Sequence, residues 1–127
     1  MIIALKQAID RLEDATPEYV DFVQDSVVSR FKILIESTWK DLGLFLYELG
    51  FTDIPGSPKG IVHLALEAKF ISKEEHEEFL TCLNLRNLAS HVYDKPQYLL
   101  AVAAAPGAFA LTKKLYNRMV TKQLPLA

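Results

Sequence analysis

The sequence predicts an all-α protein, an antiparallel up-and-down bundle of four to five helices. Apolar residues recur at spacings of three and four along most of the chain, which is the period of an amphipathic helix. Proline, glycine and capping residues separate these stretches. No stretch alternates apolar and polar residues beside a hairpin turn, so no strand is expected.

The first helix is predicted from Ile2 to Leu12, where charged residues fill the positions between the apolar ones. Thr16 and Pro17 then suggest the start of a second helix, with Thr16 as its N-cap and Pro17 at its first position.

This second helix is predicted to be long, and it carries two apolar stripes between Val20 and Leu49. Two stripes indicate two buried faces. In a short chain the second face most simply meets another copy of the chain or a partner protein. The first stripe consists of Val20, Val23, Val27, Phe31, Leu34, Thr38, Leu42, Phe45 and Leu49, and the second of Phe22, Val28, Ile35, Trp39 and Leu46.

Gly50 is expected to cap the long helix. Ser57 as N-cap and Pro58 at the first position begin a third helix that is predicted to reach Phe70.

Ser72 and Glu75 form a capping box for a fourth helix. The segment 94–96 interrupts this helix, because the residue before a proline is disfavoured in the α conformation. A last helix is predicted over residues 97–123, with a bend or break near Pro106.

Length and composition favour a single helical domain over residues 1–127. The net charge of -2 argues against a general nucleic-acid binder, and DNA is not expected as a partner. Cys82 is the single cysteine, which excludes a disulfide framework and a thiolate zinc cluster. The apolar tract 98–111 is too short to cross a bilayer, so a soluble, cytoplasmic protein is the expectation.

The segment from Arg86 to Tyr93 carries the chemistry that stands out most in this chain. It holds a permanent cation, a group that titrates near neutral pH in His91, and a phenol. Asn87 and Ser90 lie between them. Arg86 and His91 are five positions apart and would project about 140° apart on one helix, so a single copy makes a poor site.

Cleavage of RNA without a metal requires a base for the 2′-hydroxyl and a cation for the charge that grows on the phosphorane. His91 and Arg86 suit these two roles. Two such helices across a twofold axis would bring two motifs into one cleft.

A structural interpretation competes with this one. Arg86 lies beside an apolar stripe and needs a partner, such as Glu36 on the long helix. His91 would then only cap a helix end.

The chain resembles the nucleotidyltransferase substrate-binding proteins of the HEPN superfamily, whose mark is Arg-x4–6-His, usually with a polar residue after the Arg, as Asn87 is here. A closer subgroup carries Arg-x4-His-x-Tyr. Arg86, His91 and Tyr93 match that pattern. The segments 25–31 and 36–40 are similar to the long-helix signature of the family, and 49–51 and 57–59 to the positions that follow it.

The resemblance implies a helical bundle that dimerises through the long second helix and the motif helix, and a partner, a small (minimal) nucleotidyltransferase. In some such pairs the HEPN protein is a toxin-like RNase, and the partner uses ATP to adenylylate the motif tyrosine, here Tyr93. Other members are non-catalytic subunits that bind a nucleotide or substrate. A helical scaffold is the third possibility, and no tightly bound cofactor is implied.

Other candidates are weaker. His63 and His76 are thirteen residues apart, so a metal site is not expected. Trp39 is expected in the core or an interface. The acidic run around Glu75 is expected to be a solvated first turn. A basic group near the last helix end either contacts RNA or complements the helix dipole, and consists of Lys113, Lys114 and Arg118.

Overall fold

The computed structural model describes residues 2–16, 19–88 and 95–121. These residues form five helices and no strand, which confirms the predicted all-α bundle. The helices are α1 (Ile2–Asp14), α2 (Val20–Glu48), α3 (Pro58–Glu67), α4 (Lys73–Leu88) and α5 (Lys95–Thr121).

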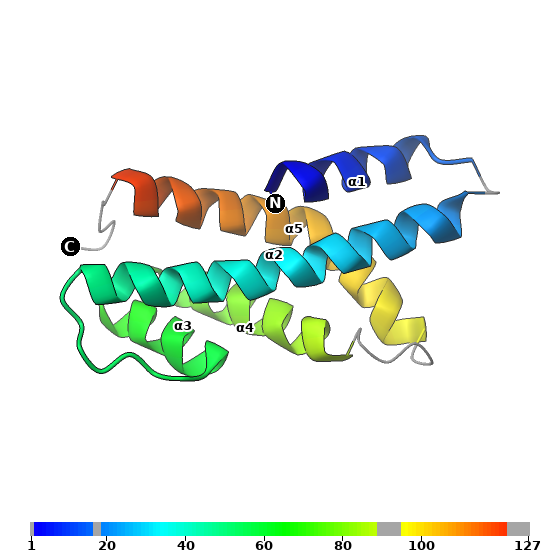
Figure 1. Ribbon diagram of the computed structural model, residues 1–127. Coiled ribbons are helices and arrows are strands. Elements are labelled where there is room, and N and C mark those ends of the chain that lie inside the picture. Colours follow the sequence, from blue (N-terminus) through cyan, green and yellow to red (C-terminus); the bar gives the residue numbers. More distant parts are fainter. Residues whose placement is uncertain (1, 17–18, 89–94, 122–127) are drawn as a thin grey trace.

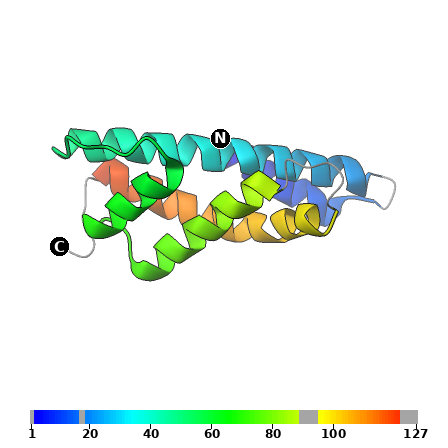
Figure 2. The ribbon, with the colours of Figure 1, turned by 90° about the horizontal axis from the view of Figure 1, so that it is seen from below.

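The long helix α2 organises the bundle. It runs the length of the molecule, with α1 and much of α5 on one side and α3 and α4 on the other (Figure 1). Seen from below, α4 crosses the molecule obliquely and also packs on α5 (Figure 2). As a result α2 contacts every other helix.

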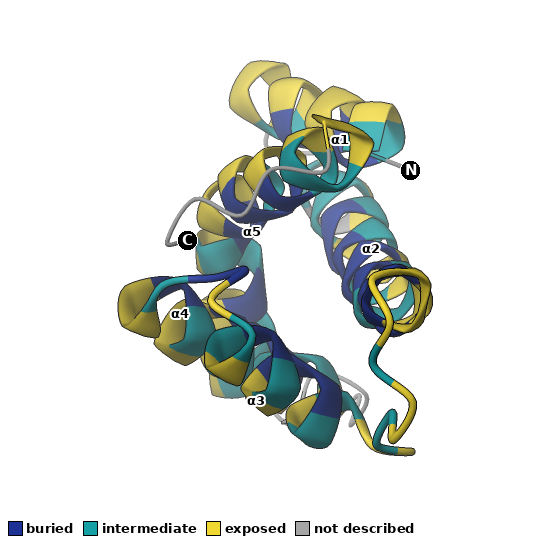
Figure 3. Ribbon diagram, turned by 90° about the vertical axis from the view of Figure 1, so that its left-hand side faces the viewer, coloured by how far each residue is buried: buried dark blue, intermediate teal, exposed yellow. Residues whose placement is uncertain are grey.

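Apolar side chains fill the space between the helices as one core. Figure 3 shows that buried residues lie on the inner sides of the helices and exposed ones on the outer sides. Cys82 is buried among them, as expected for a small hydrophobic residue. The largest fully buried side chains include Phe31, Phe70, Phe79, Leu5, Leu34, Ile35, Leu42 and Leu46.

The second apolar stripe of α2 is covered mainly by the chain itself, and the expectation that it lies free for another copy is therefore wrong. Val28, Ile35 and Leu46 of this stripe are buried in the same core as the first stripe. Phe22 is the exception, with 76% of its surface exposed. The sequence could not show this, because it does not place α3 and α4 against α2.

Local capping signals set several helix ends as predicted. The Ser57 Oγ accepts a hydrogen bond from the Gly60 N–H at 3.1 Å. In the capping box, the Ser72 N–H donates to Glu75 Oε1 at 2.8 Å and the Glu75 N–H donates to Ser72 Oγ at 3.1 Å. Gly50, with φ of +107°, follows Leu49, the C-cap residue of α2, in a conformation that favours glycine.

Two predicted helix boundaries are wrong. Helix α2 begins at Val20 with Tyr19 in the N-cap position, and the Tyr19 N–H donates to the Thr16 carbonyl at 3.0 Å. Thr16 therefore closes a turn before the helix rather than capping it. Helix α3 ends at Glu67, short of Phe70, because Lys69 adopts a left-handed φ of 61° that stops the helix.

Helix α5 begins two residues earlier than predicted. It is unbroken, which corrects the alternative of a break near Pro106, but it does bend along its course (Figure 1). It starts at Lys95, which places Pro96 in the first turn. Backbone N–H groups in the first turn have no acceptor within the helix, so the missing N–H of proline costs no hydrogen bond there. It then continues through Pro106. The fully buried Ala101 and Ala105 and the nearly fully buried Ala108 hold both halves in the core, and this packing outweighs the lost backbone hydrogen bond.

Glu75 is buried and paired, so the expectation of a solvated acidic turn is wrong for this residue. It is confirmed for the exposed Glu74, Glu77 and Glu78. Glu75 Oε1 accepts from Arg118 Nη1 at 2.7 Å, and Lys114 Nζ lies 3.8 Å from Glu75 Oε2. Burial is the strongest single influence on the pKa of Glu75 and raises it, but the hydrogen bonds from Arg118 and Ser72 together lower it below its ordinary value. Arg118 is thus a structural link between the start of α4 and the end of α5.

We expect Arg118→Met to lower the free energy of unfolding by about 2–4 kcal/mol at neutral pH, because it leaves the Glu75 carboxylate buried without its partner. The folded-state pKa of Glu75 is lowered, so the pair stabilises the fold above the ordinary Glu pKa of 4.5 and loses this effect as the pH falls through the folded-state value. Denaturant unfolding at neutral and at strongly acidic pH measures this, and an equal loss at both pH values would contradict it.

Among the residues that the structure describes, no helix is long and apolar enough to cross a membrane.

Candidate functional site

The predicted motif lies at the end of α4, and the structure describes its first two residues. Arg86 and Asn87 lie in the last turn of the helix. Ser90, His91 and Tyr93 lie outside the described residues, so their predicted roles stay predictions.

An ion pair joins Arg86 to α2. Arg86 Nη1 lies 2.5 Å from Glu36 Oε2, and the side chains of Arg86 and Glu36 are 18% and 42% exposed. On its other edge, Arg86 Nε and Nη2 donate to Asn87 Oδ1 at 3.1 and 2.7 Å. The guanidinium is therefore oriented from both sides. This is the pair that the structural interpretation predicts, but it lies at the surface rather than in the core.

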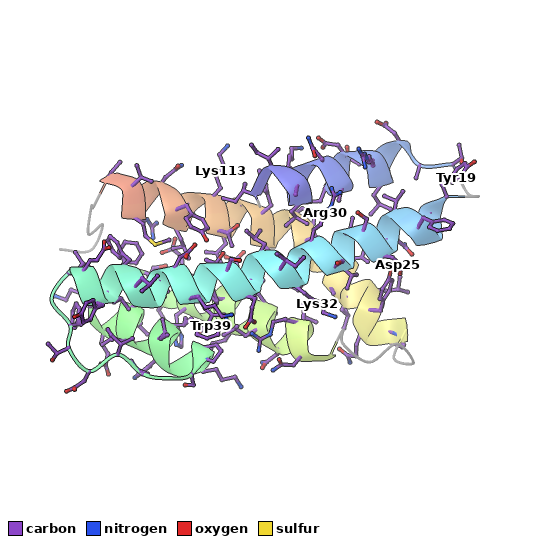
Figure 4. All side chains as sticks on the ribbon, in the orientation of Figure 1. Tyr19, Asp25, Arg30, Lys32, Trp39 and Lys113 are labelled. Carbon is purple, nitrogen blue, oxygen red and sulfur yellow. The ribbon has the colours of Figure 1, made fainter. Side chains whose placement is uncertain are left out.

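A surface groove with a volume of about 420 Å³ opens beside this ion pair. Four residues of α2 and Arg86 of α4 line it. Figure 4 shows Lys32 on the side of α2 that faces the end of α4. The lining residues are Lys32, Ile33, Glu36, Ser37 and Arg86.

Several donors surround the carboxylate of Glu36. Burial is the strongest single influence on its pKa and raises it, but the nearby N–H of Trp39 and the charge and hydrogen bond of Arg86 together lower it. Lys40 Nζ, 3.7 Å from Glu36 Oε1, adds to this effect. Glu36 is therefore ionised at neutral pH.

Trp39 packs partly against the core and lines a second surface groove, of about 480 Å³. Its Nε1 is buried and makes no hydrogen bond of normal geometry with any described residue, although it lies near Glu36. Gly43 lies in the same groove, and a Cβ there would come within 2.9 Å of Ile61 Cδ1. The groove is lined by Trp39, Lys40, Gly43, Leu44, Tyr47, Ile54 and Ile61.

The two histidines that were weaker candidates lie on α3 and α4. His63 and His76 come together from α3 and α4, with ring centroids 5.9 Å apart, and His63 Nε2 lies 3.1 Å from Glu67 Oε1. No group of three or more residues that could hold a metal occurs in the described ranges. Burial raises the pKa of Cys82 to about 12, which makes this thiol a poor nucleophile.

The sequence prediction missed Lys32 and Ser37 as residues beside Arg86. A signal exists, because Lys32, Glu36 and Lys40 follow one another at intervals of four and so share one face of α2. What the sequence could not supply is that α4 ends against this face.

The sequence profile of the nucleotidyltransferase substrate binding protein-like family matches residues 1–121, and the chain belongs to this family. A crystal structure of a protein from Thermus thermophilus is similar, with 25% identity and a TM-score of 0.73. The similarity covers 91% of this chain and 98% of that one. No curated protein matches the chain significantly. The predicted family is thus confirmed.

We expect the ion pair of Glu36 and Arg86 to contribute only about 0.5–1 kcal/mol to stability, because solvent reaches Glu36 and screens the pair. A double-mutant cycle of Glu36→Gln and Arg86→Met, followed by denaturant unfolding, measures this coupling. It should shrink as salt is added. A salt-independent coupling above about 3 kcal/mol would instead show a buried structural pair.

Proposed function

We propose that this chain is the toxin-like HEPN subunit of a two-component nucleotidyltransferase system and a metal-independent endoribonuclease. Membership of the nucleotidyltransferase substrate binding protein-like family supports the association with a nucleotidyltransferase. The observation that carries the site is the position of Arg86. It lies on the wall of an open groove, oriented by Glu36 and Asn87, where a phosphate can reach it.

In this proposal His91 is the general base or acid for the ribose 2′-hydroxyl, and Arg86 stabilises the charge that develops on the phosphorane. Asn87 supports Arg86 by accepting hydrogen bonds from two of its N–H groups. Ser90 assists in binding. A homodimer that brings two Arg86–His91 motifs into one cleft would supply both a base and an acid.

Tyr93 is the regulatory residue of the proposal. The partner, a minimal nucleotidyltransferase, transfers AMP from ATP to the phenol oxygen with release of pyrophosphate. The added phosphodiester places negative charge seven positions after Arg86 in the sequence, where it competes with an RNA phosphate. The reaction places both proteins in the cytoplasm, where RNA and ATP are available.

A second candidate is a non-catalytic subunit that binds a nucleotide or substrate for the transferase. The ion pair of Arg86 with Glu36 favours this binding function. An arginine that already has a partner can bind an anion reversibly by exchanging one for the other, and this requires no catalysis. A helical scaffold, in which this pair is only structural, is the third. Arg86→Ala would then change stability but not RNA or partner binding.

The endoribonuclease proposal predicts that the purified chain cleaves single-stranded RNA in the presence of EDTA. His91→Ala should slow cleavage by about 100- to 10,000-fold, because the general base is lost. Gel analysis of a labelled RNA measures the rate. The matched control His63→Ala changes an exposed histidine on α3 and should cleave at the wild-type rate. Equal cleavage by His91→Ala and wild type would refute the assigned role.

The regulatory proposal predicts that the neighbouring transferase and ATP add a mass of one AMP to the chain. Tyr93→Phe should abolish the addition, because it removes the acceptor oxygen. Intact-protein mass spectrometry measures this, with Tyr19→Phe as a control, since Tyr19 is an exposed tyrosine at the start of α2. Modification of Tyr93→Phe to the same extent as the wild type would rule out Tyr93 as the acceptor.

A further inference from the structure

Lys32 is a cation without an ion pair among the described residues, although it lines the same groove as Arg86. Its side chain lies on the side of α2 that faces the end of α4 (Figure 4). It is partly buried, so it is less strongly hydrated than a fully exposed lysine. An unpaired, partly dehydrated cation in a groove favours an anionic ligand.

Among the described residues, Glu36 is the only carboxylate that lines this groove, and two cations share it. Arg86 binds its Oε2 at 2.5 Å, and Lys40 approaches its Oε1 at 3.7 Å. Arg86 and Lys40 thus approach this carboxylate, and Lys32 lines the same groove. Among the described residues that line the groove, the charges of Lys32 and Arg86 outweigh that of ionised Glu36, although the whole chain carries a net charge of -2.

The geometry points to a binding site for two adjacent phosphates in this groove, in which Lys32 and Arg86 are the binding cations and Glu36 is a competing internal anion. Arg86 exchanges its bond with Glu36 for one with a phosphate oxygen, while Lys32 binds the second phosphate. The inference rests on the proposed function and deepens it, because it gives the site a ligand class and a residue that limits its affinity.

Glu36 has a definite consequence in such a site. A carboxylate on Arg86 keeps the guanidinium oriented in the free protein, but it must be displaced before a phosphate binds, and this weakens binding. Glu36→Gln keeps a hydrogen-bond acceptor for Arg86 and removes the negative charge. It should therefore bind phosphate more tightly than the wild-type chain does.

Isothermal titration of the full-length chain with inorganic pyrophosphate at low ionic strength tests the inference. We expect Lys32→Gln to weaken binding about fivefold, and Glu36→Gln to tighten it about fivefold, as is typical of charges at a partly exposed site. Both effects should shrink as salt is added. Lys73→Gln is the matched control, because Lys73 is an exposed lysine at the opposite end of α4, and it should bind like wild type.

Titrations with ATP and with a short RNA that lacks terminal phosphates identify the source of the phosphates. If Lys32→Gln changes the Kd for ATP, the site is supported and its ligand is a nucleotide. If the substitution changes the Kd for the RNA, the site is supported and its ligand is an RNA backbone. Unchanged affinity of folded Lys32→Gln or Glu36→Gln for pyrophosphate, or no binding by the wild type, would overturn the inference. RNA cleavage and AMP transfer are not part of this test, so the proposed function fails or stands separately.

Discussion

The bundle depends on one constraint, which is that α2 must bury two apolar stripes along most of its length. A helix of 29 residues with apolar side chains on two sides requires neighbours on both. Helices α1 and α5 cover one side and α3 and α4 the other. This arrangement leaves a polar face of α2 at the surface, and the end of α4 is brought against it. The ion pair of Arg86 with Glu36 forms at that junction.

Among the described residues, the two carboxylates that are buried or half-buried serve different purposes. Glu75 is nearly sealed between α4 and α5, where it accepts from the Ser72 backbone and from Arg118, and it stabilises the fold. Glu36 is open to solvent on one side and lies beside a groove. A carboxylate in the second situation can release its arginine at low cost, so the same kind of pair is suited to exchange with a ligand.

The sequence predicted what depends on neighbouring residues. Ser57 and the capping box at Ser72 act within one turn, and the structure confirms them. What depends on packing was missed: Pro106 continues a helix because buried alanines hold it, and Lys32 and Arg86 line one groove because α4 ends against α2. The family was predictable because its motifs are local, and Arg86 was identified as a candidate site residue for the same reason.

The central claim is that the groove beside Arg86 binds phosphate by exchange with Glu36. The most direct measurement is nuclear magnetic resonance of the Arg86 side-chain Nε–H during a titration with pyrophosphate, with its signal assigned by Arg86→Lys. The account predicts a saturating shift of the Arg86 signal, with no comparable shift of Arg118, whose bond to Glu75 is buried. A stationary Arg86 signal while the protein binds pyrophosphate would contradict it.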